Sequence, residues 1–546
     1  MPSKQTKLLR NISKDFSTTN FEHNYRQRKM STSFCEITGG IGLRLSTLCR
    51  AYSRRGMTFR NESFVPLISC QGENYAVKTN KRQNVQEINA SNNYFKKASK
   101  LLIVLLLPVA LLFGFSCEGL KKQAIHGNFL NETECSQTCR IKLVQSTPDN
   151  LTFATVTRSH STYSAWNSLI KNSKKELILA AYKTSLRGKH VLNDDNCQLH
   201  SNQGSKIYDA LVEAGLKRKI RIRMIENYPP KDKGDNEDGI NFAKTGVISR
   251  RNLNLEYLFG GGRMHTKFII SDFEHFYLGS ANLDWRSLNQ KLELGIIVEN
   301  CLCLAKDLSN IFEKYWEIAG DKYKSDNNEH LEKYLETNQR IIAYNEQRPL
   351  SISNEHVLAD ASPRSLNDLG RDWDLFAILN AIEKTTKFLY IEVMDYFPMF
   401  VYNLPRRYWP VIDNAIRRAI LRGVEVKILT AAIHFPEYSL RFLSSLEALN
   451  RINDSSMEVK IFKVPTDVSM QHIMKRERRM HTKFLVTDTV AVIGTSNWSG
   501  DYFDGGTTGV AFVLNQTKAS LEKRHFIRDL RYIFLSHWLV IVSTRV

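Results

Sequence analysis

The residues best suited to chemistry occur in two copies of one pattern. The six residues Arg-Met-His-Thr-Lys-Phe stand at 263–268 and again, unchanged, at 479–484. Each copy continues to an aspartate and, after a loop of small residues, an asparagine. The resulting sets are His265, Lys267, Asp272 and Asn282, and His481, Lys483, Asp488 and Asn497. A lone histidine on a strand is usually structural, but two matching sets favour one shared catalytic site.

These side chains match what phosphodiester cleavage requires. One imidazole can attack phosphorus and hold a covalent intermediate, while the other protonates the leaving oxygen and later activates water. The lysines and asparagines can donate hydrogen bonds to the phosphoryl oxygens as charge develops on them. Neither a carboxylate cluster suited to Mg²⁺ nor a zinc-ligand spacing accompanies the motifs, so we expect no metal and no other cofactor.

Other residues near the motifs allow two interpretations. Asp272 and Asp488 could carry protons, but we expect them to hydrogen-bond the backbone beneath the lysines. Aromatic residues follow the asparagines and either stack on the bases of a single strand or belong to the core. They are Trp285, Trp498, Tyr502 and Phe503. As substrate-binding candidates we take Trp285 and Trp498 together with Lys267, Asn282, Lys483 and Asn497.

The elements around the two motifs repeat in the same order. Apolar periodicity predicts helices at 163–170, 205–216, 375–383, 409–421 and 440–450, and strands at 176–182, 219–225, 388–393, 424–429 and 457–462. Such alternation favours a mostly parallel sheet with helices on both faces. We expect an α/β fold of two repeats, 146–322 and 370–546, related by a pseudo-twofold axis around one active site. The polar segment 323–369 is interpreted as linker and surface loops.

The N-terminal region differs from the body. Residues 1–100 hold 18 Lys/Arg and 6 Asp/Glu with little apolar periodicity, which predicts a disordered basic tail. The apolar run that follows predicts a transmembrane signal anchor at 101–117 and a stalk at 118–145. Lysines before the run place the tail in the cytosol and the body in a lumen. A signal peptide is the alternative if translation starts later, for instance at Met57.

Two further features fit a lumenal body. Glycosylation sequons follow the apolar run at Asn131, Asn150, Asn453 and Asn515. Cysteines occur as two spaced pairs, Cys135 with Cys139 and Cys301 with Cys303. Two disulfides are favoured over a zinc site, although spacing does not reveal which cysteines pair.

The duplicated His-x-Lys-x4-Asp motif resembles the signature of the phospholipase D superfamily. The stretches 275–288 and 493–503, together with the preceding apolar run, look like those of the type II membrane branch known as phospholipase D family members three and four. The resemblance covers nearly all of the chain after residue 130. It implies that Cys135 and Cys139 pair with Cys303 and Cys301, respectively.

The same resemblance implies a function. It points to a metal-independent 5′ exonuclease on single-stranded DNA and RNA, which forms a phosphohistidine in an acidic lumen. It also implies a type II membrane protein of the endoplasmic reticulum and endolysosomal system, with the body on the lumenal side. Some members of the branch are released as soluble lysosomal forms, and some act on anionic phospholipids. The expected partners are therefore a nucleic-acid substrate and a membrane, with an anionic phospholipid and a homodimer left open.

Three residues depart from the family or qualify its pattern. Asp488 stands where mammalian relatives carry glutamate, and Cys197 has no evident partner because no cysteine follows Cys303. Glu293 lies 28 residues after His265, where superfamily members often place a carboxylate that orients the imidazole. This position favours His265 as nucleophile and His481 as general acid, unless Glu293 is only a strand-end surface charge.

Two other functions compete with the nuclease. A lipid phosphodiesterase or transphosphatidylase would use the same histidines and lysines, but it should present apolar entry loops, whereas the loop 231–236 is polar. A non-catalytic membrane-anchored interaction protein would be expected to lose catalytic residues. Both histidines and both lysines are retained, which favours an enzyme.

Overall fold

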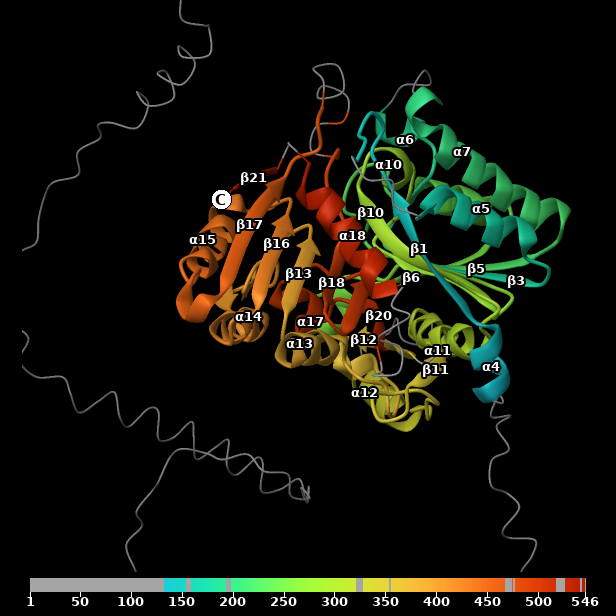
Figure 1. Ribbon diagram of the computed structural model, residues 1–546. Coiled ribbons are helices and arrows are strands. Elements are labelled where there is room, and N and C mark those ends of the chain that lie inside the picture. Colours follow the sequence, from blue (N-terminus) through green and yellow to red (C-terminus); the bar gives the residue numbers. More distant parts are fainter. Residues whose placement is uncertain are drawn as a thin grey trace, which may run out of the picture. The chain divides into compact units, whose positions relative to one another are not determined.

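Two β-sheets with matching strand orders form the core of the computed structural model (Figure 1). The structure describes residues 132–545 except 154–158, 193–197, 321–327, 353–354, 467–473, 475–476, 517–525 and 541–542. The described residues belong to one compact unit. The predicted tail at 1–100, the predicted span at 101–117 and the sequon at Asn131 lie outside them. Every described helix is too short or too polar to cross a membrane.

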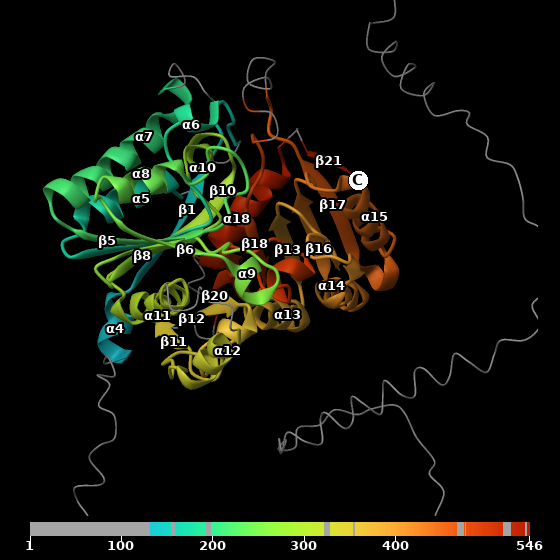
Figure 2. The ribbon, with the colours of Figure 1, turned by 180° about the vertical axis from the view of Figure 1, so that it is seen from behind.

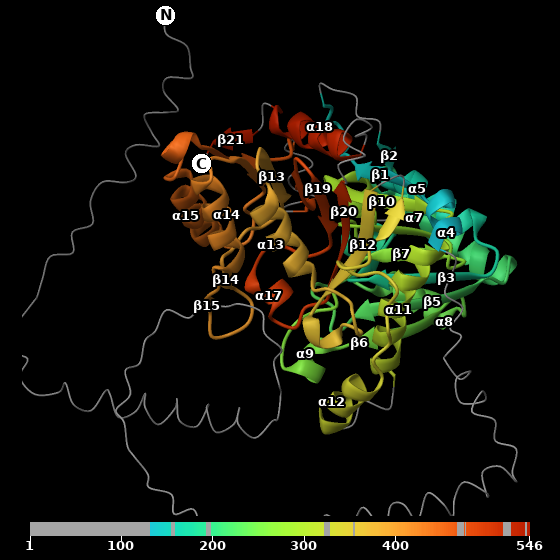
Figure 3. The ribbon, with the colours of Figure 1, turned by 60° about the horizontal axis from the view of Figure 1, so that its bottom comes forward.

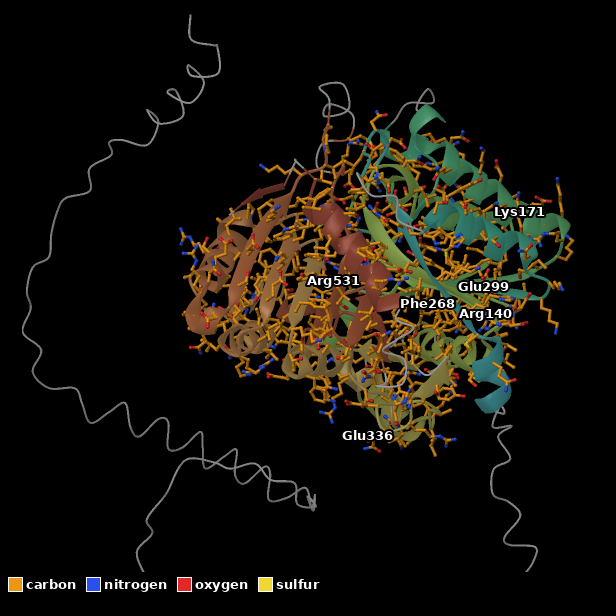
Figure 4. The ribbon with its side chains drawn as sticks, viewed as in Figure 1. Arg140, Lys171, Phe268, Glu299, Glu336 and Arg531 are labelled. Atoms are coloured by element: carbon orange, nitrogen blue, oxygen red, sulfur yellow. A yellow bond between two sulfur atoms is a disulfide. The ribbon has the colours of Figure 1, made fainter. Side chains whose placement is uncertain are left out.

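The first sheet has the order β2-β1-β10-β8-β7-β3-β5-β6. Its strands are β1 (Arg140–Ser146), β2 (His160–Ser161), β3 (Glu176–Ala181), β5 (Arg221–Asn227), β6 (Ser249–Leu253), β7 (Phe268–Ser271), β8 (His275–Gly279) and β10 (Glu293–Glu299). Strands β3, β5 and β6 are parallel, whereas β10, β8, β7 and β3 pair antiparallel. Figure 4 labels Arg140 and Glu299, which face each other in the antiparallel pair β1·β10.

The second sheet repeats this arrangement in the order β11-β12-β20-β19-β18-β13-β16-β17-β21. Its strands are β11 (Leu350–Ile352), β12 (Glu355–Ser362), β13 (Phe388–Val393), β16 (Glu425–Thr430), β17 (Ser456–Phe462), β18 (Lys483–Thr487), β19 (Val490–Gly494), β20 (Gly509–Gln516) and β21 (Ser543–Arg545). Thus β12, β20, β19, β18, β13, β16 and β17 occupy the places of β1, β10, β8, β7, β3, β5 and β6. The predicted α/β fold of two related repeats is confirmed.

Helices cover both faces of each sheet. In the first repeat, α5 (Thr162–Asn172) and α7 (Gln198–Val212) lie on one side of the sheet and α11 (Leu302–Ile318) on the other (Figures 1 and 2). In the second, α13 (Asp374–Lys384) and α14 (Val411–Leu421) lie opposite α18 (Phe526–Trp538) (Figure 3). Helix α11 also contacts β12, and α18 also contacts β1. These two helices therefore pack against both repeats.

Further α-helices and two pairs of short strands accompany the two sheets. The helices are α4 (Glu132–Thr138), α6 (Lys189–Leu192), α8 (Glu237–Lys244), α9 (Leu255–Phe259), α10 (Trp285–Asn289), α12 (Asn328–Thr337), α15 (Pro436–Glu447) and α17 (Gly500–Phe503). Two-residue strands form the pairs β4 (Thr184–Ser185) with β9 (Leu283–Asp284), and β14 (Met399–Phe400) with β15 (Arg407–Tyr408).

Three features of the predicted organisation were wrong. The sheets are mixed rather than mostly parallel, because β7–β8 and β18–β19 are joined by turns of a few residues, which permit only antiparallel pairing. The segment 323–369 is more than a linker, since β12 pairs along its whole length with β20. Strand β12 was not predicted because two of its buried residues, Asp360 and Ser362, are polar and interrupt the apolar pattern. The segment predicted as stalk, 118–145, likewise contributes α4 and most of β1 to the body.

Two disulfides fasten α4 to the beginning of α11. Cys135 bonds Cys303, and Cys139 bonds Cys301. This is the pairing that the family resemblance implies. Because all four sulfurs are in disulfides, they do not form the alternative zinc site.

The described sequons differ in accessibility. Asn150 and Asn453 are exposed, and both have positive backbone φ angles. Asn515 is half-buried within β20. Asn150 and Asn453 are thus the more accessible of the described sequon asparagines.

Each motif aspartate anchors the turn that precedes the central strand of its repeat. Asp272 accepts hydrogen bonds from the backbone N–H groups of residues 174, 175 and 176 at 2.7, 2.8 and 2.9 Å. Asp488 accepts from Thr385 Oγ1 at 2.6 Å and from the N–H and Oγ1 of Thr386 at 3.2 and 3.1 Å. Both aspartates follow β7 or β18 at the end away from the motif lysine. These contacts give both aspartates the structural role expected from the sequence rather than the alternative role of proton carriers.

Replacing Asp272 tests this role. Because its carboxylate satisfies three backbone N–H groups, we expect Asp272→Ala to destabilise the fold by about 2 kcal/mol or more. Thermal melting of the full chain measures the effect. Glu274→Ala, an exposed change in the same turn, should leave the midpoint within about 1 °C. An Asp272→Ala midpoint equal to that of the wild type would contradict the anchoring role.

Candidate active site

Backbone pairing across the two repeats brings the motifs together. Met264 forms a parallel bridge with Thr508, and Met480 forms the corresponding bridge with Leu292. The His481 N–H donates to the Leu292 carbonyl at 2.8 Å, and the Thr508 N–H donates to the Arg263 carbonyl at 2.8 Å. Each motif therefore starts at the seam, the line where the backbones of the two repeats pair with each other. The pseudo-twofold relation predicted from the sequence holds at the site.

The two motifs meet in one cavity of about 610 Å³. Its lining includes both motif histidines and both asparagines, His265, Asn282, His481 and Asn497. The lysines lie fully buried, and each Nζ donates to the carbonyl of the histidine two residues earlier at 2.5 Å. Phe268, which follows Lys267, lies among the first-repeat strands in Figure 4. The expected single site built from two halves is thus present in the geometry.

Glu293 supports the histidine of the other repeat. Its two carboxylate oxygens lie 2.9 and 2.8 Å from His481 Nδ1. Ser280 Oγ and Ser287 Oγ also donate to this buried carboxylate, at 2.6 and 2.7 Å. The expectation that Glu293 orients His265 was wrong. Strand β10 begins at the seam, so its first side chain points towards the second motif rather than its own.

His265 has a different environment. Its ring lies between Tyr182 and Tyr502, with centroids 4.9 and 5.0 Å away. Its backbone N–H donates to Thr508 Oγ1 at 3.0 Å. Nδ1 is buried without a hydrogen-bond partner of ordinary geometry. Gly509 stands at the start of β20, where Glu293 starts β10, so no carboxylate of this strand supports His265. The two imidazoles are therefore chemically unequal.

The asparagines are fixed at the cavity by short local contacts. The Asn282 N–H donates to Ser287 Oγ at 3.2 Å, and Asn497 Nδ2 donates to the Tyr502 hydroxyl at 2.9 Å. The side-chain Oδ1 atoms of both residues are buried without a partner. Each of these oxygens can accept a hydrogen bond from a group that enters the cavity.

Burial and mutual repulsion disfavour protons on the basic groups. Burial lowers the pKa of His265 well below its usual value, and Lys267 and Lys483 lower it further. Burial and Lys483 likewise hold the pKa of His481 well below normal. Burial lowers the pKa of Lys483 to about 7, although Glu293 and Asp395 oppose this shift. An anion in the cavity would relieve the repulsion, which is the electrostatic condition for stabilising a phosphoryl group.

The predicted tryptophan contacts are absent from this cavity. Trp285 is fully buried against Met474, and its backbone and Cβ leave no room for a side chain at Gly204. Trp498 is buried in the second-repeat core, and its backbone pairs with Asp395 and Phe397. Their assignment to substrate binding was wrong. They pack because α10 and the 497–499 turn lie against neighbouring elements rather than against the opening.

Other cavity residues were missed in the sequence. Arg263 and Arg479, the first residues of the identical hexapeptide, both line the cavity, so the shared arginine was an available signal. Tyr182 ends a predicted strand, and Lys291 lies two residues before Glu293. Lys291 forms an ion pair with Glu477 at 3.1 Å, which no local sequence pattern indicates.

Comparisons with known proteins agree with this site. The family model described as "PLD3/4, PLD-like domain" matches residues 154–467. The chain is 35% identical over 446 residues to the Xenopus laevis 5′-3′ exonuclease PLD3, covering 80% of this chain and 87% of that one. It is 34% identical over 472 residues to the Homo sapiens protein of that name, covering 83% and 91%. For a Caenorhabditis elegans protein named "Probable phospholipase D", the identity is 32% over 469 residues, covering 83% and 80%. The chain therefore belongs to the PLD3/4 family of phospholipase-D-like proteins.

Proposed function

We propose that this protein removes nucleotides from the 5′ end of single-stranded DNA or RNA by metal-independent phosphodiester cleavage. The observation that carries the proposal is the meeting of both His-x-Lys motifs in one cavity, with Glu293 of one repeat bound to His481 of the other. Relatives that bear the name 5′-3′ exonuclease support the choice of substrate.

The unequal histidines divide the reaction into two steps. Neutral His265 attacks phosphorus through Nε2, and the bond from phosphorus to the leaving oxygen breaks as His481 donates a proton to that oxygen. The phosphoryl group is then covalently held on His265. In the second step His481 takes a proton from water, the resulting hydroxide attacks phosphorus, and the bond to His265 breaks.

Glu293 suits His481 for the proton-transfer role. A carboxylate at Nδ1 fixes the tautomer with the proton on Nδ1, which leaves Nε2 free to exchange a proton with the leaving oxygen or water. It also stabilises the imidazolium that must form. His265 lacks such a carboxylate, so it stays a neutral nucleophile. This is the role assignment expected from the sequence, although it rests on the opposite placement of Glu293.

The motif lysines and asparagines would stabilise the charge on the phosphoryl group. Lys267 and Lys483 lie beneath the cavity, and Asn282 and Asn497 line it, so they surround the place where phosphoryl oxygens would lie between the histidines. Such preplaced donors stabilise the charge of the transition state, and one donor typically contributes 10²–10³-fold in rate.

We place this activity in an oxidising, acidic lumen of the endolysosomal system. The two disulfides support an oxidising compartment. The apolar run at 101–117 supports a type II anchor, and exposed Asn150 and Asn453 support glycosylation. Release of a soluble form and assembly of a homodimer remain further parts of the proposal.

A cleavage assay with the full chain tests the function. Single-stranded DNA labelled at its 3′ end is incubated with EDTA at pH 5 and pH 7.5. We expect stepwise shortening that stops when a bulky group blocks the 5′ end and that falls at least 10³-fold in His265→Ala. Persistent cleavage of the blocked strand would contradict 5′ attack.

The same preparation distinguishes the alternatives. Intact DNA together with transfer of the headgroup of an anionic phospholipid would establish the lipid reaction instead. Inactivity on both substrates, with normal thermal melting, would favour the interaction protein. His356→Ala serves as the matched control, because His356 is exposed on β12 and does not line the cavity.

The pH profile follows from the pKa of Lys483. The ammonium form of Lys483 is the form that stabilises the phosphoryl charge, and burial lowers its pKa to about 7. Raising the pH from 6 to 8 therefore removes that charge in the free enzyme. We expect kcat/KM to fall about tenfold over this range, because kcat/KM follows the ionisation of free enzyme. A flat profile between pH 6 and pH 8, with the protein still folded, would contradict this expectation.

A further inference from the structure

The catalytic centre is nearly symmetric, but a nucleic-acid strand has a direction. Strands β3 and β13 end at Ala181 and Val393, so Tyr182 and Lys183 correspond to Met394 and Asp395 in the other repeat. Lys183 forms ion pairs with Asp235 and Asp284 at 3.1 and 3.2 Å. On the second-repeat side, Asp395 instead holds a histidine. The two sides of the cavity therefore carry different charged side chains, although the motif residues between them are nearly symmetric.

We infer that Tyr402 and His434 form a subsite for the terminal nucleoside attached to the scissile phosphate, with the base stacked on Tyr402 and the sugar hydrogen-bonded to His434. This subsite rests on the proposed exonuclease function and supplies the asymmetry that fixes which end of the strand enters. Both residues line the catalytic cavity, and neither belongs to the duplicated motif.

Aromatic rings connect Tyr402 to the reacting centre. The ring centroids of His265 and Tyr502 are 5.0 Å apart, and those of Tyr502 and Tyr402 are 6.4 Å apart. Phe435 continues the row at 6.1 Å from Tyr402. A nucleoside bonded to a phosphate at His265 would thus meet aromatic surface on this side. Tyr402 is 44% exposed as a residue and lines the cavity.

The hairpin that carries Tyr402 is held in place. Asp501 accepts hydrogen bonds from the backbone N–H groups of Val401, Tyr402 and Asn403 at 2.8, 3.1 and 2.8 Å. Asp501 directly precedes Tyr502, so the same short helix, α17, positions both tyrosines. Because the backbone is already fixed, stacking a base on Tyr402 requires little further ordering.

His434 is oriented by a buried carboxylate. Its Nδ1 lies 2.5 Å from Asp395 Oδ2, while Asp395 Oδ1 accepts the N–H groups of Ile433 and His434 at 3.0 and 3.2 Å. This contact occupies Nδ1 and orients the ring, so that Nε2 is the nitrogen left to contact a substrate. Nε2 has no partner among the described residues. A sugar hydroxyl can both donate and accept a hydrogen bond, so it can pair with Nε2 in either protonation state of the ring.

Stacking is tested by removing the base from the substrate and the ring from the protein. The full chain is assayed on two oligonucleotides that differ only in the 5′-terminal residue, which is thymidine or an abasic tetrahydrofuran. We expect the abasic end to lower wild-type kcat/KM about tenfold, as for loss of one base–aromatic stack. Tyr402→Phe should retain this ratio. Tyr402→Ala should reduce it below about threefold, because the ring that senses the base is gone.

His434 is tested through the sugar, which both substrates contain. We expect His434→Ala to raise KM about tenfold on both oligonucleotides and to change kcat less than threefold. Tyr408→Ala is the matched control, since Tyr408 is 62% exposed on the same hairpin and does not line the cavity. Tyr408→Ala should leave KM and kcat unchanged on both oligonucleotides.

The outcomes separate the subsite from the proposed function. An inactive wild type on both oligonucleotides would overturn the exonuclease itself. The stacking role would be overturned if the active wild type had the same kcat/KM on both oligonucleotides. It would also be overturned if Tyr402→Ala kept the tenfold difference between them. An unchanged KM in His434→Ala would overturn the sugar contact.

Discussion

The contact between Glu293 and His481 is the interaction on which the site depends. It joins a carboxylate at the start of β10 to the imidazole that precedes β18, and so it crosses from one repeat to the other. The paired backbone bridges of Met264 and Met480 hold that crossing in register. Either repeat alone would lack part of the site. The first repeat would keep Glu293 buried without its partner, and the second would keep His481 without the carboxylate that orients it. The duplication in the sequence is therefore a requirement of the chemistry.

The residues at the two ends of each motif strand, β7 and β18, have different functions. At one end, Asp272 and Asp488 accept hydrogen bonds from the turns that precede β3 and β13. At the other, the lysines turn back onto their own chain beneath the cavity. Burying several basic groups together is unfavourable until an anion arrives, which is why their pKa values are low. The anchored strands keep these groups in place despite their repulsion, so little rearrangement is needed when a phosphate enters.

Local sequence patterns predicted the local structure well. The helices and strands before each motif, the pairing of motifs and the structural role of Asp272 follow from periodicity and residue type. Long-range partners did not follow. Glu293 was matched to the histidine nearest in sequence, because spacing along the chain does not show which repeat a strand end faces. Strand β12 was missed because Asp360 and Ser362 are buried polar residues, and Trp285 was misplaced because aromatic character alone does not distinguish core from cavity.

Trapping the covalent intermediate tests the unequal roles of the two histidines most directly. An oligonucleotide labelled at its first internucleotide phosphate is mixed with the wild type, His265→Ala and His481→Ala, quenched in alkali, and the labelled peptide is identified by mass spectrometry. We expect label on His265 in the wild type, none in His265→Ala, and label that persists longer in His481→Ala because hydrolysis of the intermediate is slowed. Label on His481, or cleavage without any labelled histidine, would contradict it.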